Sequence, residues 1–217
     1  MKKKVLNTVF LCVDAVVIIL VALAAFTDVF TVDHSLWNTG VRKFVFYTVD
    51  SNVIAALFLL IAYPFKVRRL VTGRPLPVFT AAAALVGSAA VSVTFMTVLL
   101  FLGPTMGYGG MYVGNNLLLH LICPVLCVLS FICDTYAGKK LSFAFTPLSA
   151  VPTAIYAVVY YIMVMVIGRD NGGWGDFYGF NIGGRWYVSF AGMIVFAYGL
   201  GALLWLLHRQ TEKKALG

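Results

Sequence analysis

The stretch VFTAAAALVGSAAVSVTFMTVLLFL, residues 78–102, decides the fold, because it runs for 25 residues without a charged side chain. A helix that crosses the hydrocarbon core of a membrane needs about 20 apolar residues. Six stretches of the chain reach this length, at residues 5–26, 44–65, 78–102, 112–133, 148–168 and 186–207. A membrane β-strand needs only about 10 residues of alternating polarity. The sequence therefore predicts an all-α integral membrane protein with six transmembrane helices.

The composition of the whole chain agrees with this class. Hydrophobic residues make up 61% of the sequence and charged residues only 11%, which is far from the average soluble domain. No internal repeat and no linker divides the chain, so we expect one six-helix transmembrane domain over residues 1–217.

The first apolar stretch has the outline of a secretory signal peptide. Lys2, Lys3 and Lys4 precede it, and the segment 22–24 reads Ala-Leu-Ala, like a cleavage site. However, Asp14 interrupts the apolar run, and the run is long enough to span a membrane. We therefore expect a retained first helix.

The basic residues predict how the helices are oriented. Only four of the 16 lysines and arginines fall on the side opposite the termini, namely Arg42, Lys43, Arg169 and Arg185. The other 12 lie in the N-terminus, the segments 66–77 and 134–147, and the C-terminal tail. Because cytoplasmic loops are rich in Lys and Arg, both termini are expected in the cytoplasm, which in a bacterium means an integral protein of the cytoplasmic membrane. Contact with anionic lipid headgroups accounts for the net charge of +8 without a nucleic-acid partner.

Cofactor and metal sites are not expected. The four cysteines lie in the expected spans and form no Cys-x-x-Cys pair, so they indicate small buried side chains rather than a disulfide or zinc site. Haem bound by two histidines would need a second histidine within the membrane, whereas His34 and His208 lie at the ends of the expected spans.

Polar residues at similar depth in two spans mark the candidate site. His120 interrupts the apolar run 116–126, and an imidazole in hydrocarbon is costly enough to suggest a function. At 1.5 Å per residue, Thr48 lies roughly 6 Å below the outer end of its span, Asn52 about 12 Å, and His120 roughly 10–12 Å. Thr48, Ser51 and Asn52 share one helix face, because they are spaced by three and four residues.

Two further polar residues extend the candidate site. The first is Asn116, which shares a helix face with His120. Asp50 is not one of them, because it lies about 200° around the helix from Thr48 and faces away from the cluster. Asp14 rises from the inner side to about one turn beneath His120, and the expected spans contain no lysine or arginine to pair with it. Asp14 is therefore the carboxylate expected to orient the imidazole. All these groups could instead be polar contacts that hold helices together.

The motif Tyr47-Thr48-Val-Asp-Ser-Asn52, followed two spans later by Leu-Leu-Leu-His120 and Pro124, resembles the androgen-induced-gene and androgen-dependent-regulator family of membrane hydrolases and their six-span bacterial relatives. The resemblance implies hydrolysis of fatty acid esters of hydroxy fatty acids, with Thr48 as nucleophile and His120 as base. In the animal motif the threonine stands three residues before the asparagine, and here it stands four before. Ser51 or Asp50 therefore remain possible occupants of the nucleophile position.

The chemistry of these residues suits an esterase. A histidine can remove the proton from a threonine hydroxyl, and Asn52 or Asn116 could donate an N–H to the oxyanion. The substrate would be a lipid or an acyl chain that enters from the membrane. The glycine-rich segment 168–185 would be either a lid over an outward-facing cavity or an ordinary interfacial loop. A proton-coupled carrier of small molecules, or a non-catalytic membrane protein with a polar packing cluster, is the alternative.

Overall fold

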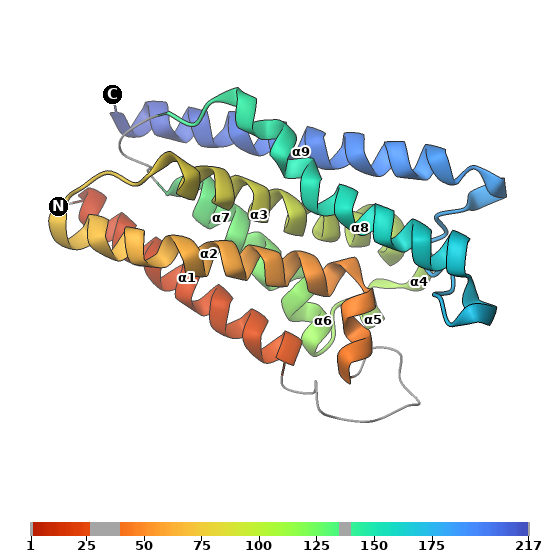
Figure 1. Ribbon diagram of the computed structural model, residues 1–217. Coiled ribbons are helices and arrows are strands. Elements are labelled where there is room, and N and C mark those ends of the chain that lie inside the picture. The colour runs from red at the N-terminus through yellow and green to blue at the C-terminus, as the bar shows by residue number, and fades with distance from the viewer. Residues whose placement is uncertain (1, 27–39, 135–139, 217) are drawn as a thin grey trace.

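The computed structural model describes residues 2–26, 40–134 and 140–216, and within these ranges the protein is helical without a strand. Six helices are long and apolar enough to cross a membrane, as expected: Lys4–Phe26, Tyr47–Thr72, Val78–Met106, Asn115–Cys133, Phe143–Ile167 and Trp186–Lys213. They form one elongated bundle, and the two termini lie at the same end of it (Figure 1).

Several of the six spans combine different kinds of helix. The first two spans are α1 (Lys2–Phe26) and α2 (Tyr47–Thr72), and the short 3₁₀ helix η1 (Gly40–Val45) precedes α2. The third joins α3 (Val78–Thr97), the π-helix η2 (Val98–Leu102) and α4 (Gly103–Met106). After α5 (Tyr108–Met111), the fourth joins α6 (Asn115–Leu117), the π-helix η3 (Leu118–Ile122) and α7 (Cys123–Cys133). The fifth joins the 3₁₀ helix η4 (Phe143–Ala150), α8 (Val151–Tyr161) and the π-helix η5 (Ile162–Ile167). The short 3₁₀ helices η6 (Arg169–Asn171) and η7 (Ile182–Gly184) precede the sixth, α9 (Trp186–Leu216).

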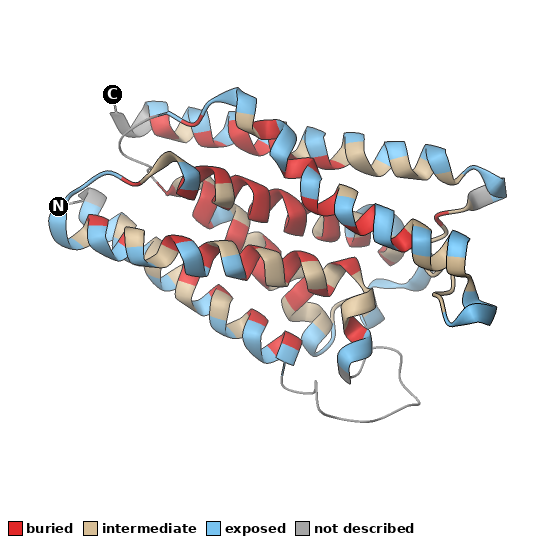
Figure 2. Ribbon diagram, viewed as in Figure 1, coloured by how far each residue is buried: buried red, intermediate tan, exposed pale blue. Residues whose placement is uncertain are grey.

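Helix α3 lies at the centre of the bundle. Its side chains are mostly buried, while the outer helices turn exposed faces away from it (Figure 2). Small residues let α2 approach closely, since a Cβ built on Gly87 would lie 3.1 Å from the Cα atom of Ala55. Such close approach is how membrane helices gain van der Waals contact in the absence of a hydrophobic driving force.

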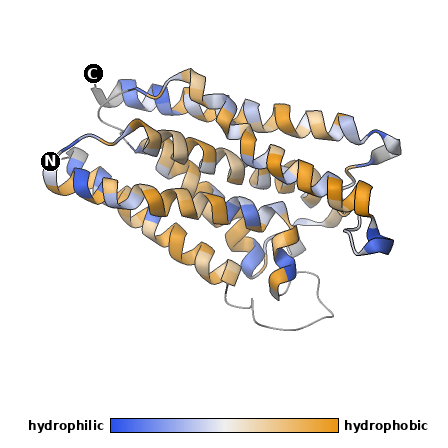
Figure 3. Ribbon diagram, viewed as in Figure 1, coloured by the Kyte–Doolittle hydropathy of each residue, from blue (hydrophilic) through white to orange (hydrophobic). Residues whose placement is uncertain are grey.

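The helices are hydrophobic along most of their length (Figure 3). Large side chains such as Leu60, Ile61, Phe101 and Val195 are more than half exposed. Exposed apolar surface on this scale marks an interaction surface. Because six helices are long and apolar enough to cross a membrane, lipid is the expected contact of this surface. The structure thus supports a multi-pass integral membrane protein.

The second helix is longer than the sequence suggests. It was expected to end near residue 65, with a loop from residue 66 to residue 77, but α2 continues to Thr72 and ends where Gly73 adopts a left-handed conformation (φ 71°). The reason is that Lys66 and Arg69 are buried and hold ion pairs, which keeps this turn of the helix packed against its neighbours. Lys66 therefore lies within a spanning helix.

Candidate functional site

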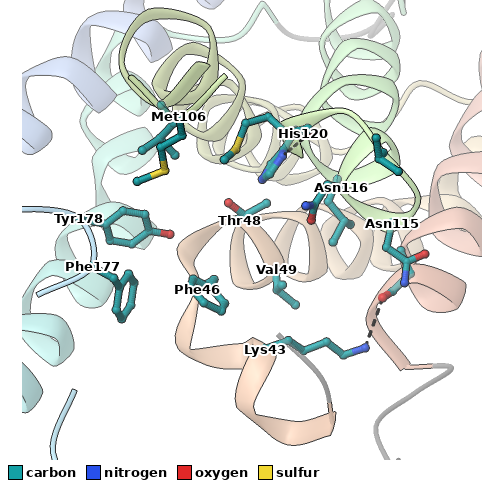
Figure 4. A pocket seen from close by; sticks show the side chains of 15 residues that line it. Lys43, Phe46, Thr48, Val49, Met106, Asn115, Asn116, His120, Phe177 and Tyr178 are labelled. Atoms are coloured by element: carbon teal, nitrogen blue, oxygen red, sulfur yellow. Dashed lines mark hydrogen bonds between the residues drawn. The ribbon is translucent and has the colours of Figure 1, made fainter. Parts of the chain in front are cut away.

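A cavity of about 540 Å³ lies beside the first turn of α2 and the π-helix η3. Its polar wall includes Thr48, Asn116, His120 and Tyr178, which come from three separate parts of the chain (Figure 4). The volume is within the range of about 300–1,000 Å³ that is typical of small-molecule sites. The cavity brings together the threonine, the histidine and one of the asparagines that the sequence singled out.

Thr48 is the second residue of α2. Phe46 precedes the helix in an extended conformation (φ −96°, ψ 127°), so the Thr48 side chain stands at the very start of the helix. The first N–H groups of a helix have no partner within it, and this end carries partial positive charge. The position therefore stabilises negative charge on or near the Thr48 oxygen.

His120 lies in η3 and is 7% exposed. Its Nδ1 atom is 2.8 Å from the carbonyl oxygen of Met111. Since a carbonyl can only accept a hydrogen bond, Nδ1 must carry the proton, and in a neutral imidazole the lone pair is then on Nε2. The backbone of Met111 thus sets the tautomer that a general base needs.

Tyr178 is a member of the site that the sequence did not identify. It is half-buried and lines the cavity. In Figure 4 its hydroxyl group points toward Thr48. Burial raises the pKa of Tyr178 to about 12, although the neighbouring Thr48 side chain opposes this shift. The hydroxyl therefore stays protonated and can donate a hydrogen bond at neutral pH.

The glycine-rich segment 168–185 places Tyr178 and its neighbour Phe177 in the cavity wall. Asp176 shapes this segment, because its two carboxylate oxygens accept hydrogen bonds from the backbone N–H groups of Phe180 (2.6 Å) and Asn181 (2.9 Å). The Tyr160 hydroxyl accepts from the Tyr178 N–H (3.0 Å). The glycine and aromatic residues of this segment suggested a lid over a cavity. The sequence did not distinguish Tyr178 from the other aromatic residues of the segment.

Asn52 is placed to support the site from outside the cavity. Its Nδ2 atom donates to the carbonyl oxygens of Thr48 (2.7 Å) and Leu119 (2.9 Å), and the side chain is fully buried. Both N–H groups are thus used by the backbone, so Asn52 has none left to donate to an oxyanion. Asn116 does line the cavity and uses one N–H on the carbonyl oxygen of Gly110 (3.3 Å), which leaves the other for a ligand.

Ser51 and Asp50 do not line the cavity. The Ser51 hydroxyl is fully buried, 2.8 Å from the Thr94 hydroxyl on α3. Thr48, Ser51 and Asn52 were expected to face the site together. Instead Thr48 lines the cavity, whereas Ser51 and Asn52 are buried between helices. Of the nucleophile candidates on this helix, Thr48 alone reaches the cavity.

The expectation that Asp14 orients His120 is wrong. One carboxylate oxygen of Asp14 lies 2.5 Å from the Lys66 ammonium group, and the other accepts from the Ser130 hydroxyl at 2.5 Å. Lys66 also contacts Asp134 (2.7 Å), which in turn binds Arg69 (2.7 Å). The basic partner was overlooked because α2 was expected to end before Lys66. Asp14 belongs to this ionic cluster, which joins α1, α2 and the end of α7.

The described residues offer no candidate metal site. In the part of the chain that the structure describes, no group of three or more His, Cys, Asp or Glu side chains could hold a metal ion. His208 is buried, with Nδ1 2.9 Å from the carbonyl oxygen of Phe131, and His34 lies outside the described residues.

Comparisons with known protein families, with curated proteins and with solved structures gave no match to this chain.

Proposed function

We propose that the protein is an intramembrane lipid-ester hydrolase with Thr48 as nucleophile and His120 as general base. The observation that carries this proposal is that both side chains line one cavity, where His120 is fixed by Met111 in the tautomer that leaves Nε2 free to accept a proton. A threonine hydroxyl needs such a base to become a nucleophile.

The reaction would proceed in two steps. His120 Nε2 takes the proton of Thr48 Oγ1 as this oxygen attacks the ester carbonyl carbon. The tetrahedral intermediate collapses, the C–O bond to the alcohol breaks, and the alcohol leaves with the proton from His120. In the second step His120 deprotonates a water molecule, which attacks the acyl-threonine. The fatty acid then leaves, and Thr48 regains its proton.

Two side-chain groups in the cavity wall would stabilise the oxyanion. They are the hydroxyl of Tyr178 and the remaining N–H of Asn116. Oxyanion stabilisation by such fixed donors is usually the largest single contribution to catalysis. Asn52 would act differently, by fixing the backbone on both sides of the site.

The substrate class follows from the setting of the site. A membrane-embedded cavity with apolar residues such as Phe46 and Leu119 in its wall suits an acyl chain, and the resemblance of the Thr48 and His120 motifs implies a fatty acid ester of a hydroxy fatty acid. With both termini in the cytoplasm, as the basic residues suggest, the cavity would open toward the outer leaflet.

A fluorophosphonate probe tests the proposal directly, because a base-activated hydroxyl attacks its phosphorus atom, displaces fluoride and becomes phosphonylated. The purified protein in detergent should be labelled, and Thr48→Ala and His120→Ala should each abolish labelling without a change in thermal melting. Ser51→Ala is the matched control and should label normally. Labelling that survives Thr48→Ala but disappears in Ser51→Ala would identify Ser51 as the nucleophile instead. If the wild type shows neither labelling nor ester turnover, and both Thr48→Ala and His120→Ala lower the melting temperature, then these polar residues serve to hold helices together and not to catalyse a reaction.

A proton-coupled carrier is the second candidate, and the buried ionic cluster of Asp14, Lys66, Asp134 and Arg69 favours it. Charged groups inside a bundle commonly mark proton pathways. Among the described residues, however, no hydrogen bond connects this cluster to His120. Acidification of proteoliposomes upon addition of a solute would support the carrier, whereas ester turnover without proton movement would support the hydrolase.

A further inference from the structure

The connection between the third and fourth spans carries the backbone group that fixes His120. It includes the one-turn helix α5, and the carbonyl oxygen of Met111, the last residue of α5, lies 2.8 Å from His120 Nδ1. A helix of one turn has little stability of its own. The tautomer of His120 therefore depends on the contacts that hold α5 against the rest of the bundle.

Tyr108, the first residue of α5, ties this helix to the third span. Its hydroxyl group donates a hydrogen bond of 2.8 Å to the carbonyl oxygen of Leu99 in the π-helix η2. In η2 the N–H of Gly103 donates to the carbonyl oxygen of Val98, and the same pattern would pair Leu99 with residue 104. That residue is a proline, which has no N–H. The Tyr108 hydroxyl thus supplies a donor to a carbonyl that the π-helical pattern leaves without an N–H.

The third span is also shaped to receive the ring of Tyr108. Gly103 has helical backbone angles (φ −61°, ψ −47°), and a Cβ atom built on it would collide with the Tyr108 ring. The ring therefore occupies the space that a side chain at Gly103 would fill. Gly107, with a φ of 87° that suits glycine, separates α4 from α5 and lets the chain turn back toward η2.

The backbone of α5 joins Tyr108 to Met111. The N–H of Tyr112 donates to the carbonyl oxygen of Tyr108 (3.1 Å), which closes the turn around Met111. The rings of Tyr108 and Tyr112 are stacked, with centroids 6.1 Å apart and planes 4° apart. Asn116 adds a second tether, from its Nδ2 atom to the carbonyl oxygen of Gly110, but at 3.3 Å this bond is longer than the bond from Tyr108.

We propose that Tyr108 is a positioning residue of the hydrolase, which fixes the Met111 carbonyl and thereby the tautomer of His120. The inference rests on the proposed hydrolase and adds a residue that acts from outside the cavity, since Tyr108 is not among the lining residues. A histidine whose Nδ1 loses its acceptor can carry the proton on Nε2 instead. Nε2 then has no lone pair with which to accept the proton of Thr48.

Steady-state kinetics test the role of the hydroxyl group. Tyr108→Phe keeps the ring and should lower kcat about three- to tenfold, the usual worth of one hydrogen bond, with KM within about twofold of the wild type. Tyr112→Phe is the matched control and should keep kcat, because its hydroxyl has no hydrogen-bond partner in the ranges that the structure describes. Since Tyr108 is 43% exposed, neither variant should change thermal melting. A Tyr108→Phe enzyme with wild-type kcat would overturn the proposal.

Gly103→Ala tests the same contact without a change in Tyr108. The helical backbone at Gly103 accepts alanine, a better helix former, so a loss of activity would arise from the displaced ring. Gly103→Ala should reproduce the fall in kcat, and the double variant with Tyr108→Phe should fall no further, because both remove one interaction. Gly109→Ala is the control, since a Cβ there meets nothing within 4 Å. Additive losses in the double variant would contradict the shared mechanism.

The nitrogen chemical shifts of His120 separate this proposal from the hydrolase itself. In protein with isotopically labelled histidine, NMR at a pH where His120 is neutral reports which ring nitrogen carries the proton, and the His120→Ala spectrum identifies its signals. The wild type should show the Nδ1–H form, and Tyr108→Phe should move His120 toward the Nε2–H form, whereas Tyr112→Phe should not. This change without ester turnover by the wild type would retain the coupling of Tyr108 to His120 and reject the hydrolase. Turnover with an unchanged tautomer in Tyr108→Phe would reject the coupling and retain the hydrolase.

Discussion

Asn52 donates a hydrogen bond of 2.9 Å to the carbonyl oxygen of Leu119, the residue that precedes His120. The same amide group donates to the carbonyl oxygen of Thr48 at 2.7 Å. Leu119 lies in a π-helical turn, a feature that often occurs at functional sites because it changes the backbone hydrogen-bond pattern. One buried side chain therefore fixes the backbone of both proposed catalytic residues.

Replacement of Asn52 by Asp should impair the site while keeping its shape. A carboxylate cannot donate to two carbonyl oxygens, and a buried acceptor without a donor costs about 1–3 kcal/mol. We expect a lower melting temperature and a fall in kcat with little change in KM, because the position of His120 relative to Thr48 is disturbed. Steady-state kinetics and thermal melting in detergent would measure both effects.

Asn171→Asp is the control for that substitution. Asn171 is exposed, and its side chain donates to the carbonyl oxygen of Ile167 (3.0 Å) at the surface, so its replacement should change stability by no more than about 0.5 kcal/mol. If Asn52→Asp left kcat unchanged once the protein was folded, Asn52 would be a packing residue alone.

Removal of the Tyr178 hydroxyl by Tyr178→Phe should lower kcat by roughly 10²–10³, the usual cost of losing one oxyanion donor. Because the pKa of Tyr178 is about 12, the hydroxyl is protonated from pH 6 to pH 10, and the wild-type rate should show no break from this group in that range. A pH profile of kcat for both proteins would measure this. Tyr187→Phe, at an exposed tyrosine, should have no effect; a Tyr178→Phe enzyme with wild-type kcat would exclude the hydroxyl from the reaction.

Disruption of the ion pair between Asp14 and Lys66 should act on stability. Loss of one partner of a buried pair costs about 3–5 kcal/mol, while replacement of both by neutral groups is often tolerated. We therefore expect Asp14→Asn to lower the free energy of unfolding strongly, and the double variant Asp14→Asn, Lys66→Met to recover part of it. Ester turnover per folded molecule should fall less in Asp14→Asn than in His120→Ala. A folded Asp14→Asn protein as inactive as His120→Ala would instead indicate a proton pathway through Asp14.

The orientation in the membrane can be tested with single cysteines in a cysteine-free background. Lys140→Cys and Asp170→Cys both place the thiol at exposed positions, at opposite ends of the fifth span. An impermeant maleimide applied to intact cells should label the cysteine at position 170 and spare the one at position 140. The opposite pattern would place the termini outside the cytoplasm.

The sequence was sufficient for the helical class and the number of spans, because uninterrupted apolar length is a property of each segment alone. The sequence also predicted that Thr48, Asn116 and His120 lie close together, because helical rise fixes the relative depth of residues in different spans. Helical phase was less informative, since Ser51 and Asn52 share a face with Thr48 in the pattern but do not line the cavity.

The partner predicted for Asp14 was wrong. The second span was expected to end before Lys66, so this lysine was assigned to a loop and not considered as an ion-pair partner within the bundle. Tyr178 and Tyr108 could not be found from periodicity, because they lie in connections whose path depends on tertiary contacts.

The pairing of Asp14 with Lys66 has a consequence for how the protein is made. The two residues are 52 positions apart, so at about 5–20 residues per second the ribosome needs roughly 3–10 s to synthesise the lysine after the aspartate. During that interval α1 has no basic partner for Asp14, and a charge at this depth disfavours release into lipid. We therefore expect α1 to stay at the insertion machinery until Lys66 has been synthesised, and to enter the bilayer together with α2 as a helical hairpin.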